Sequence, residues 1–260
     1  MAETALTRAA GGPSVLRPTR VSLIRAVTLL ALLGAWELLA RSGWLYEGVV
    51  PPLEKVVAAC VQLLLTPAMY RHLGVTAWEV AAGFALGFAA GVACGVPMGA
   101  GRFFGDAVGP YVDAFATAPK IIFLPIAMLL FGTGIGSKLA LGAASAFFPV
   151  AINTAAGVRQ IDPVLARVGR SFRLSAWQMA TRIYFPALRR SLVTSMRLAF
   201  GLAVVGVLLA EIKLSSAGLG FLANEYYTRF RVPDLYAVLI LVFALAVGAN
   251  SLMGRLARRF

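Results

Sequence analysis

Residues 157–190 read GVRQIDPVLARVGRSFRLSAWQMATRIYFPALRR, a basic, polar insert between two long apolar runs. Asp162 can cap a helix that starts at the proline after it, because proline lacks the amide proton that the first position would leave unused. Ser175 and Gln178 have the spacing of a capping box for a second helix, and Pro186 predicts where that helix ends. These signals predict a helical hairpin rather than a loose loop.

The first helix of this hairpin should carry an apolar strip beside its arginines. At helical spacing the strip comprises Val164, Leu165, Val168 and Phe172, and Arg167, Arg170 and Arg173 fall on other faces. Two interpretations stay open from these local signals. The hairpin is a docking surface for another protein, or it is a basic loop that only sets membrane topology.

The composition indicates an integral membrane protein. The chain has 260 residues, of which 60% are hydrophobic and 13% charged, and its mean hydropathy is +0.82. A soluble domain is roughly half apolar and a quarter charged. The net charge of +13 would suggest a nucleic-acid partner in a soluble protein. Here the arginines lie between apolar runs, so the positive-inside rule explains them and we expect membrane lipid, not nucleic acid, as the surrounding partner.

Few residues could support an enzyme or a metal site. Cys60 and Cys94 lack metal-like spacing and are expected to be small packing residues, and His72 is the single histidine. Asp113 and Glu211 are separate acids with no evident partner. We therefore expect no catalytic residues, no metal and no enzyme activity.

Six apolar segments are long enough to span a bilayer, at about 20 residues each. They cover approximately residues 21–40, 77–100, 109–131, 137–156, 192–210 and 235–253. Residues 1–20 form a polar, basic tail, and no cleavage site follows the first apolar run, so that run is expected to be retained as a span. Within the connection 41–76, residues 53–65 are expected to lie on the membrane surface. The predicted fold class is an all-α integral membrane protein with one domain at 21–260, whose core covers about 75–255.

A glycine repeat marks the second span. Glycine recurs every fourth residue, at Gly83, Gly87, Gly91, Gly95 and Gly99. Such a stripe lets another helix approach closely, and we expect close helix packing there. A surface on which helices slide during a transport cycle is the alternative.

Four polar residues in the spans are candidates for the transport pathway. Lys120 lies in the proline-broken third span, where a charge is expensive and functional by default. The alternative to a functional role is a structural one, in which the Lys120 ammonium group binds a neighbouring side chain or the carbonyls that the prolines free. The other candidates are Asn153, Arg197 and Glu211.

The distribution of lysine and arginine predicts the orientation. With both termini inside, the inner segments hold most of the arginines, including seven between residues 159 and 190. The positive-inside rule therefore places both termini and the hairpin in the cytoplasm.

The hairpin now resembles the EAA loop of bacterial ABC importer permeases. That loop has the pattern Glu-Ala-Ala, three residues, Gly, nine residues, Ile, one residue, Leu-Pro. Here residues 167–169, from Arg167 to Gly169, stand where the pattern has Glu-Ala-Ala, and Arg173 stands where it has the glycine. Ile183 and Pro186 stand where it has the isoleucine and the proline. The spacing matches, whereas the acidic residue and the glycine of the pattern are both arginine.

Other stretches are similar to the nitrate/sulfonate/taurine branch of these permeases. Residues 117–125 and 130–134 resemble its third helix, 147–163 the segment that leads into its coupling loop, and 197–211 its fifth helix. The resemblance covers about residues 50–260.

The resemblance implies a type I importer permease in a bacterial inner membrane. Two such subunits, identical or paired with a homologue, would form the pathway, and a periplasmic or lipid-anchored binding protein would deliver the solute. A cytoplasmic ABC ATPase dimer would hold ATP and Mg²⁺, and this chain, which lacks a phosphate-binding loop, would bind no cofactor. Residues of the coupling hairpin would be Asp162, Arg167, Gly169, Arg170, Arg173, Ser175, Trp177, Ile183 and Pro186.

The branch narrows the solute to a few classes. It handles nitrate, sulfonates and taurine, and also pyrimidine-type vitamin precursors, and Lys120 with Arg197 gives a preference for a small anion. A channel or secondary transporter without ATP is the rival function, although the inverted repeats of many transporters are not evident. Arg167 in place of glutamate predicts an acidic groove on the matching ATPase.

Overall fold

The computed structural model describes residues 18–44 and 49–259, and these residues form helices and turns without a strand. They divide into two compact units, which meet in the sequence between residues 57 and 58. The predicted tail falls mostly outside the described residues, and residues 18–20 begin the first helix.

The first unit contains α1 (Pro18–Arg41) and the start of α2 (Leu53–Leu65). Contacts near the end of α1 join these two segments. Glu37 accepts hydrogen bonds from Arg41 Nε at 2.5 Å and from the Leu53 amide at 3.0 Å, and Trp36 Nε1 donates to the Pro51 carbonyl at 3.0 Å. The charged end of this apolar helix therefore has protein partners.

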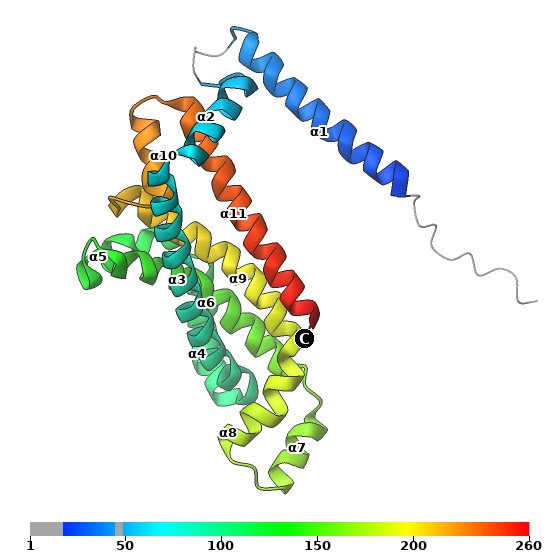
Figure 1. Ribbon diagram of the computed structural model, residues 1–260. Coiled ribbons are helices and arrows are strands. Elements are labelled where there is room, and N and C mark those ends of the chain that lie inside the picture. Colours follow the sequence, from blue (N-terminus) through cyan, green and yellow to red (C-terminus); the bar gives the residue numbers. More distant parts are fainter. Residues whose placement is uncertain (1–17, 45–48, 260) are drawn as a thin grey trace, which may run out of the picture. The chain divides into compact units, whose positions relative to one another are not determined.

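Three long helices form the centre of the second unit. They are α3 (Pro67–Ala100), α6 (Ile135–Arg159) and α9 (Phe185–Leu214), and they lie side by side in Figure 1. α6 packs along both α3 and α9. This stack fixes the ends from which the functional segments project.

The glycine stripe of α3 lies against α6. Gly83, Gly87, Gly91 and Gly95 are buried, and Gly99 is half-buried. A Cβ added at Gly91 would lie 2.7 Å from Val150 Cβ, and one added at Gly95 would lie 2.6 Å from the Ala151 carbonyl oxygen. Side chains larger than hydrogen would push the two helices apart, so the stripe sets their separation.

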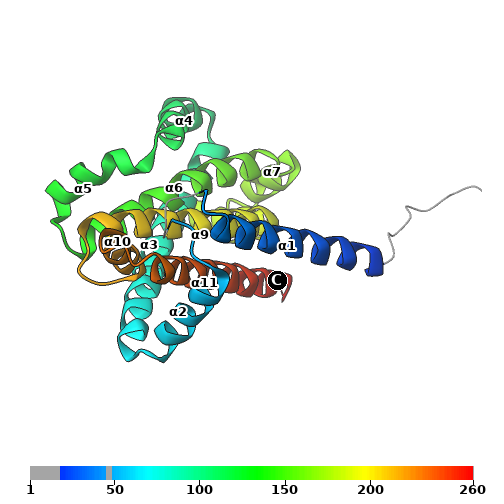
Figure 2. The ribbon, with the colours of Figure 1, turned by 90° about the horizontal axis from the view of Figure 1, so that it is seen from above.

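The predicted third span is sharply bent. It consists of α4 (Arg102–Thr117), the short 3₁₀ turn η1 (Lys120–Phe123) and α5 (Leu124–Phe131), with a bend of 101° between the two arms. Pro119 stands at the break, where α4 has ended at Thr117. Figure 2 shows α4 and α5 to one side of the α3–α6–α9 stack.

α10 (Leu219–Thr228) and α11 (Val232–Arg259) complete the second unit. Ala59 and Leu63 of α2 pack with Leu219 and Leu222 of α10 and Val238 of α11. The segment 53–65 is therefore a helix with the predicted bounds, and its second half belongs to an apolar core.

Two boundaries differ from the sequence-based expectation. α3 begins at Pro67, not near residue 77, because a proline at the first position starts a helix well before the apolar run does. The second hairpin helix does not end at Pro186. α8 (Ala176–Met179) continues through the π-helical turn η2 (Ala180–Tyr184) into α9. The wider π turn accommodates a ring that would clash with a preceding carbonyl in a regular α-helix.

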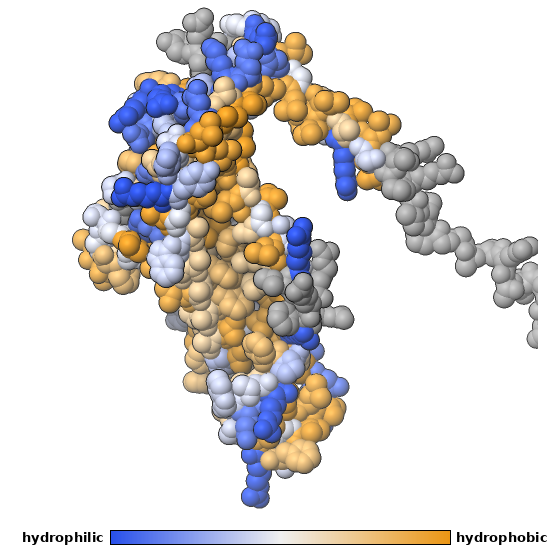
Figure 3. Space-filling view, in the orientation of Figure 1, coloured by the Kyte–Doolittle hydropathy of each residue, from blue (hydrophilic) through white to orange (hydrophobic). Residues whose placement is uncertain are grey.

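The helices are suited to a membrane. Within the part of the chain that the structure describes, five are long and apolar enough to span, or six if α4 with η1–α5 counts as one bent span. Figure 3 shows apolar side chains over the flanks of the long helices and polar ones over the hairpin at their lower end. The all-α integral membrane fold is therefore confirmed.

Candidate functional site

The first helix of the hairpin, α7 (Pro163–Ser171), begins as its sequence indicates. The Asp162 side chain accepts a hydrogen bond from the Val164 amide at 2.8 Å, and Pro163 occupies the first turn. The second helix starts with a complete capping box, in which Ser175 and Gln178 each bond the other's backbone amide. Side chains thus cap the starts of both helices.

The turn between the two helices is a Schellman motif. The Leu174 amide donates to the Gly169 carbonyl at 3.1 Å, and the Arg173 amide donates to the Arg170 carbonyl at 2.9 Å. Arg173 has φ +51°, the left-handed conformation that glycine adopts most easily. Arg173 therefore occupies, with strain, the conformation for which the glycine of the EAA pattern is suited.

Gly169 lies at a close contact within the hairpin. It is buried, and an added Cβ would collide with Met179 Sδ and lie 2.5 Å from Ile183 Cδ1. α7 therefore packs against the second helical segment without space for a side chain. Ile183, which belongs to η2, packs against Gly169 in this contact.

The outward face of the hairpin is apolar and basic. Phe172 and Trp177 are each 76% exposed, and Val164, Leu165 and Val168 are about half exposed. Arg167 and Arg170 of α7 are exposed as well. Such a combination of unburied aromatic and charged side chains on a capped, rigid element is typical of a protein-binding surface.

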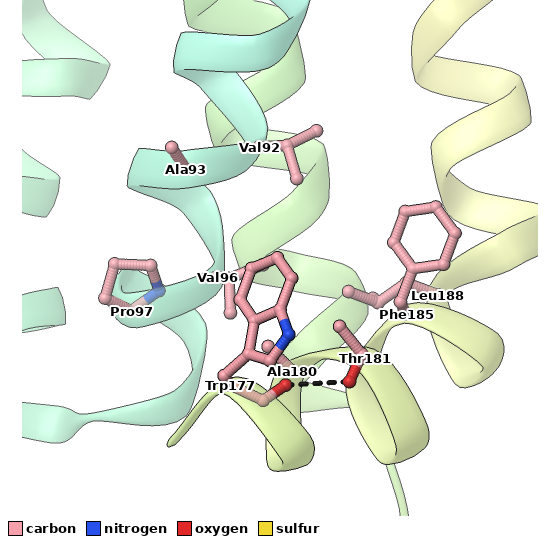
Figure 4. Close-up of a pocket in the computed structure, with 9 residues that line it drawn as sticks. All are labelled: Val92, Ala93, Val96, Pro97, Trp177, Ala180, Thr181, Phe185 and Leu188. Carbon is pink, nitrogen blue, oxygen red and sulfur yellow. Dashed lines mark hydrogen bonds between the residues drawn. The ribbon is translucent and has the colours of Figure 1, made fainter. Parts of the chain in front are cut away.

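An apolar groove lies between the hairpin and the end of α3. Its volume is about 460 Å³, and its walls come from α3 on one side and from α8, η2 and α9 on the other. Figure 4 shows the indole ring of Trp177 pointing from α8 toward Val96 of α3, with Phe185 beyond it. The groove belongs to the same end of the molecule as the hairpin surface.

Lys120 is engaged at the break between α4 and α5. Its Nζ donates to the carbonyls of Phe115 at 2.9 Å, Ala116 at 2.7 Å and Ala118 at 2.7 Å, and it lies 5.0 Å from the Phe148 ring centroid. These three bonds use all three ammonium protons. Lys120 therefore binds the backbone carbonyls that the break in the helix frees, which is the second of the two alternatives given for it. Contact of Lys120 with a solute stays a prediction.

The other pathway candidates lie in separate places. Arg197 Nε donates to Asn250 Oδ1 of α11 at 3.1 Å, and Arg197 is exposed. The Asn153 carbonyl accepts from Ser191 Oγ at 3.1 Å, in the contact of α6 with α9. The structure therefore does not bring Lys120, Asn153, Arg197 and Glu211 together as one site.

Glu211 lies in a buried polar cluster at the end of α9 away from the hairpin. We define the polar cluster as Thr76, Glu79, Lys138, Glu211 and Ser215. Glu211 is fully buried and Glu79 and Lys138 are 1% and 5% exposed. Thr76 Oγ1 donates to Glu211 Oε1 at 2.7 Å, Lys138 pairs with Glu79, and Lys138 Nζ donates to Ser215 Oγ at 3.0 Å. The expectation that Glu211 has no partner is therefore wrong.

The polar cluster was missed because its members come from three helices. Glu79 and Lys138 are lone charges of opposite sign at the edges of two predicted spans, and that pattern is the signal that could have paired them. No periodicity within one helix links them, since a tertiary contact of α3, α6 and α9 brings them together.

Comparison with known proteins identifies relatives over most of the chain. Residues 83–260 match the family described as "Binding-protein-dependent transport system inner membrane component". A protein of Escherichia coli strain K12, named as the aliphatic sulfonates transport permease protein SsuC, is 32% identical over 216 residues, covering 83% of this chain and 82% of the relative. The nitrate import permease protein NrtB of a Synechocystis strain is 29% identical over 240 residues, covering 88% and 83%.

A solved structure has the same fold. A chain from the inward-facing MetNI methionine ABC transporter superposes with a TM-score of 0.59 at 20% identity, covering 75% of this chain and 98% of that chain. At this identity the likeness bears on the fold alone.

Proposed function

The chain belongs to the family of binding-protein-dependent transport system inner membrane components, and on that premise we propose how its parts serve import. It is a permease subunit of an ABC importer and not an enzyme, and the ATPase is a separate chain. Our proposal is that the hairpin of residues 157–190 docks in a groove of that ATPase on the cytoplasmic side of the bacterial inner membrane, with both termini on the same side. ATP and Mg²⁺ then bind the partner, and this chain holds no cofactor.

The observation that carries the proposal is the exposed face of a rigid hairpin. Phe172 and Trp177 project from helices whose starts are capped and whose turn is closed by the Schellman bonds. Burying two such aromatic side chains in a partner's groove supplies affinity, and a capped element can transmit a push without melting. The exposed Arg167 supports an acidic patch in the facing groove.

The importer needs further partners. We propose a second permease subunit of the same sequence, packed on the α4–α5 side, where Ile122, Leu129 and Leu130 are exposed. A periplasmic or lipid-anchored binding protein delivers the solute to the opposite membrane face. The coupling hairpins of the two subunits then receive the motion of the ATPase dimer together.

A small anion is the proposed solute. Two relatives are named for sulfonates and nitrate, and both solutes are anions. Lys120 adds no support of its own, because three backbone carbonyls use its ammonium protons. A pyrimidine-type vitamin precursor is the alternative, which a ligand screen on the partner binding protein would reveal.

Copurification of the ATPase tests the docking surface. The double variant Phe172→Ser with Trp177→Ser should lose most of the ATPase that the wild-type permease retains on an affinity column. Both side chains are mostly exposed, so their removal leaves the fold intact. Arg167→Glu in the same assay should also retain less ATPase, by repulsion from the acidic groove.

The matched control is Phe230→Ser, which removes a phenyl ring that is 86% exposed in the turn between α10 and α11. It should retain the ATPase at the wild-type level. Equal retention by the Phe172/Trp177 variant and the wild type would contradict docking through this face, and tighter or unchanged binding by Arg167→Glu would contradict the acidic groove.

A further inference from the structure

One unbroken helical run joins the hairpin to the polar cluster. α8, η2 and α9 follow one another from Ala176 to Leu214 without an intervening turn. At 1.5 Å per residue, the part from Phe185 to Glu211 is about 39 Å long. A displacement of the hairpin therefore reaches Glu211 through a single rod, provided that the rod stays rigid.

At its far end the rod is bonded to the start of α10. Three successive backbone amides at this start donate to side chains of other helices. They are Gly218 to His72 Nδ1 at 3.0 Å, Leu219 to Thr76 Oγ1 at 2.7 Å and Gly220 to Glu211 Oε2 at 2.6 Å. Orphan amides at the N-terminus of a helix attract a negative charge, and the Glu211 carboxylate supplies it here.

Glu211 packs closely against the start of α10. Gly218 has φ +115°, and a Cβ there would collide with the Glu211 carboxyl carbon. A Cβ at Gly220 would lie 2.7 Å from Glu211 Cβ. The two glycines let the backbone close around the carboxylate, so α10 cannot shift relative to α9 without breaking bonds in a buried site.

Other helices are bonded into the same place. Thr76 of α3 donates to Glu211 and accepts from Leu219, and Lys138 of α6 pairs with Glu79 of α3 and donates to Ser215 after α9. Breaking a buried ion pair by removing one partner is strongly destabilising. The polar cluster thus joins α3, α6 and α9 to α10 through hydrogen bonds and an ion pair as well as apolar contacts.

We propose that Glu211 is a positioning residue for transport, which makes α10 follow the movement of α9. This inference rests on the proposed function, because the movement originates where the ATPase docks on the hairpin. When the hairpin moves, α9 moves as a rod and the bonds of Glu211 carry α10 with it. The turn at the opposite membrane face then changes position in the same step as the hairpin.

Distances between spin labels on the two permease copies test this linkage. The assembled importer, with Cys60 and Cys94 replaced by alanine, carries a label either at Arg182 of the hairpin or at Thr228 of α10, both exposed. Distances are measured without nucleotide and with ATP and vanadate. In the wild-type background both distances should shift, and in Glu211→Ala the shift at position 182 should remain while the shift at position 228 is lost.

Ser195→Ala is the matched control on the same rod. Ser195 is buried in α9 and donates to the Ser191 carbonyl at 2.9 Å. It precedes Glu211 by about 24 Å along the helix. Its loss removes a hydrogen bond of α9 but should leave both shifts in place. Thermal unfolding of each variant separates lost stability from lost transmission, since a merely structural role predicts a lower melting temperature with both shifts retained.

Thr76→Val provides a second variant if Glu211→Ala does not assemble. It removes the hydroxyl that joins Glu211 to Leu219 and leaves the carboxylate in place. It should reduce the shift at position 228 relative to the wild type. A shift at position 228 that is unchanged in the variants, or absent in the wild type while position 182 moves, overturns the inference. A wild-type complex without any hairpin shift contradicts the proposed function instead.

Discussion

Two residues other than glycine adopt a left-handed backbone conformation, which glycine adopts most easily. Among the described residues other than glycine, Arg173 at φ +51° and Phe230 at φ +54° have positive φ. Each follows a helix end closed by Schellman bonds, since the Arg231 amide donates to the Tyr226 carbonyl at 2.9 Å and the Phe230 amide to Tyr227 at 3.1 Å. Both are exposed, so packing does not hold them there. The hydrogen bonds of the turn impose the strain.

Replacing Arg173 by glycine should therefore stabilise the hairpin. Relief of the left-handed strain is worth about 1 kcal/mol. The comparison is with Arg173→Ala, which removes the same guanidinium and keeps a Cβ. We expect Arg173→Gly to unfold at a higher temperature in detergent than Arg173→Ala. Equal melting temperatures would mean that the turn imposes no strain on this residue.

At the scale of elements, the α3–α6 contact depends on the absence of side chains. A Cβ at Gly87 would collide with the Ala143 carbonyl and lie 2.8 Å from Ala146 Cβ. Gly87→Ala should therefore destabilise the protein by about 1–3 kcal/mol, as overpacking does in a core. Gly74→Ala, on the same helix with nothing within 4 Å, should be neutral or stabilising by up to about 1 kcal/mol. Thermal unfolding of the two variants in detergent checks this, and similar melting temperatures would contradict a close α3–α6 contact.

At this scale the sequence predicts the features that depend on local interactions and does not predict those that depend on tertiary contacts. The caps at Asp162 and Ser175 and the glycine stripe were readable, because a few neighbouring residues or a fixed period specify them. The continuation of the helix past Pro186 could not be predicted, because it depends on a π turn that no local sequence rule indicates. The polar cluster could not be predicted either, because Glu79, Lys138 and Glu211 meet only after three helices have packed.

At the scale of the second unit, the two ends of the helical stack differ in charge. The hairpin end contains seven arginines between residues 159 and 190, and the turn between α10 and α11 contains Arg229 and Arg231. Those two are paired, with Glu225 and Asp234 respectively. The excess of positive charge at the hairpin end supports its placement in the cytoplasm.

Labelling with a membrane-impermeant maleimide tests that orientation. In a protein whose Cys60 and Cys94 are replaced by alanine and which is expressed without its ATPase, Phe230→Cys should react in intact cells and Phe172→Cys only after the membrane is permeabilised. Both positions are highly exposed, at 86% and 76%, so a difference in labelling reports the side of the membrane rather than burial in the protein. The expected pattern follows from the charge asymmetry, because arginine-rich segments are retained on the cytoplasmic side. The opposite pattern would place the hairpin outside, where no ATPase could reach it, and would contradict the coupling role of the hairpin together with the proposed linkage to α10.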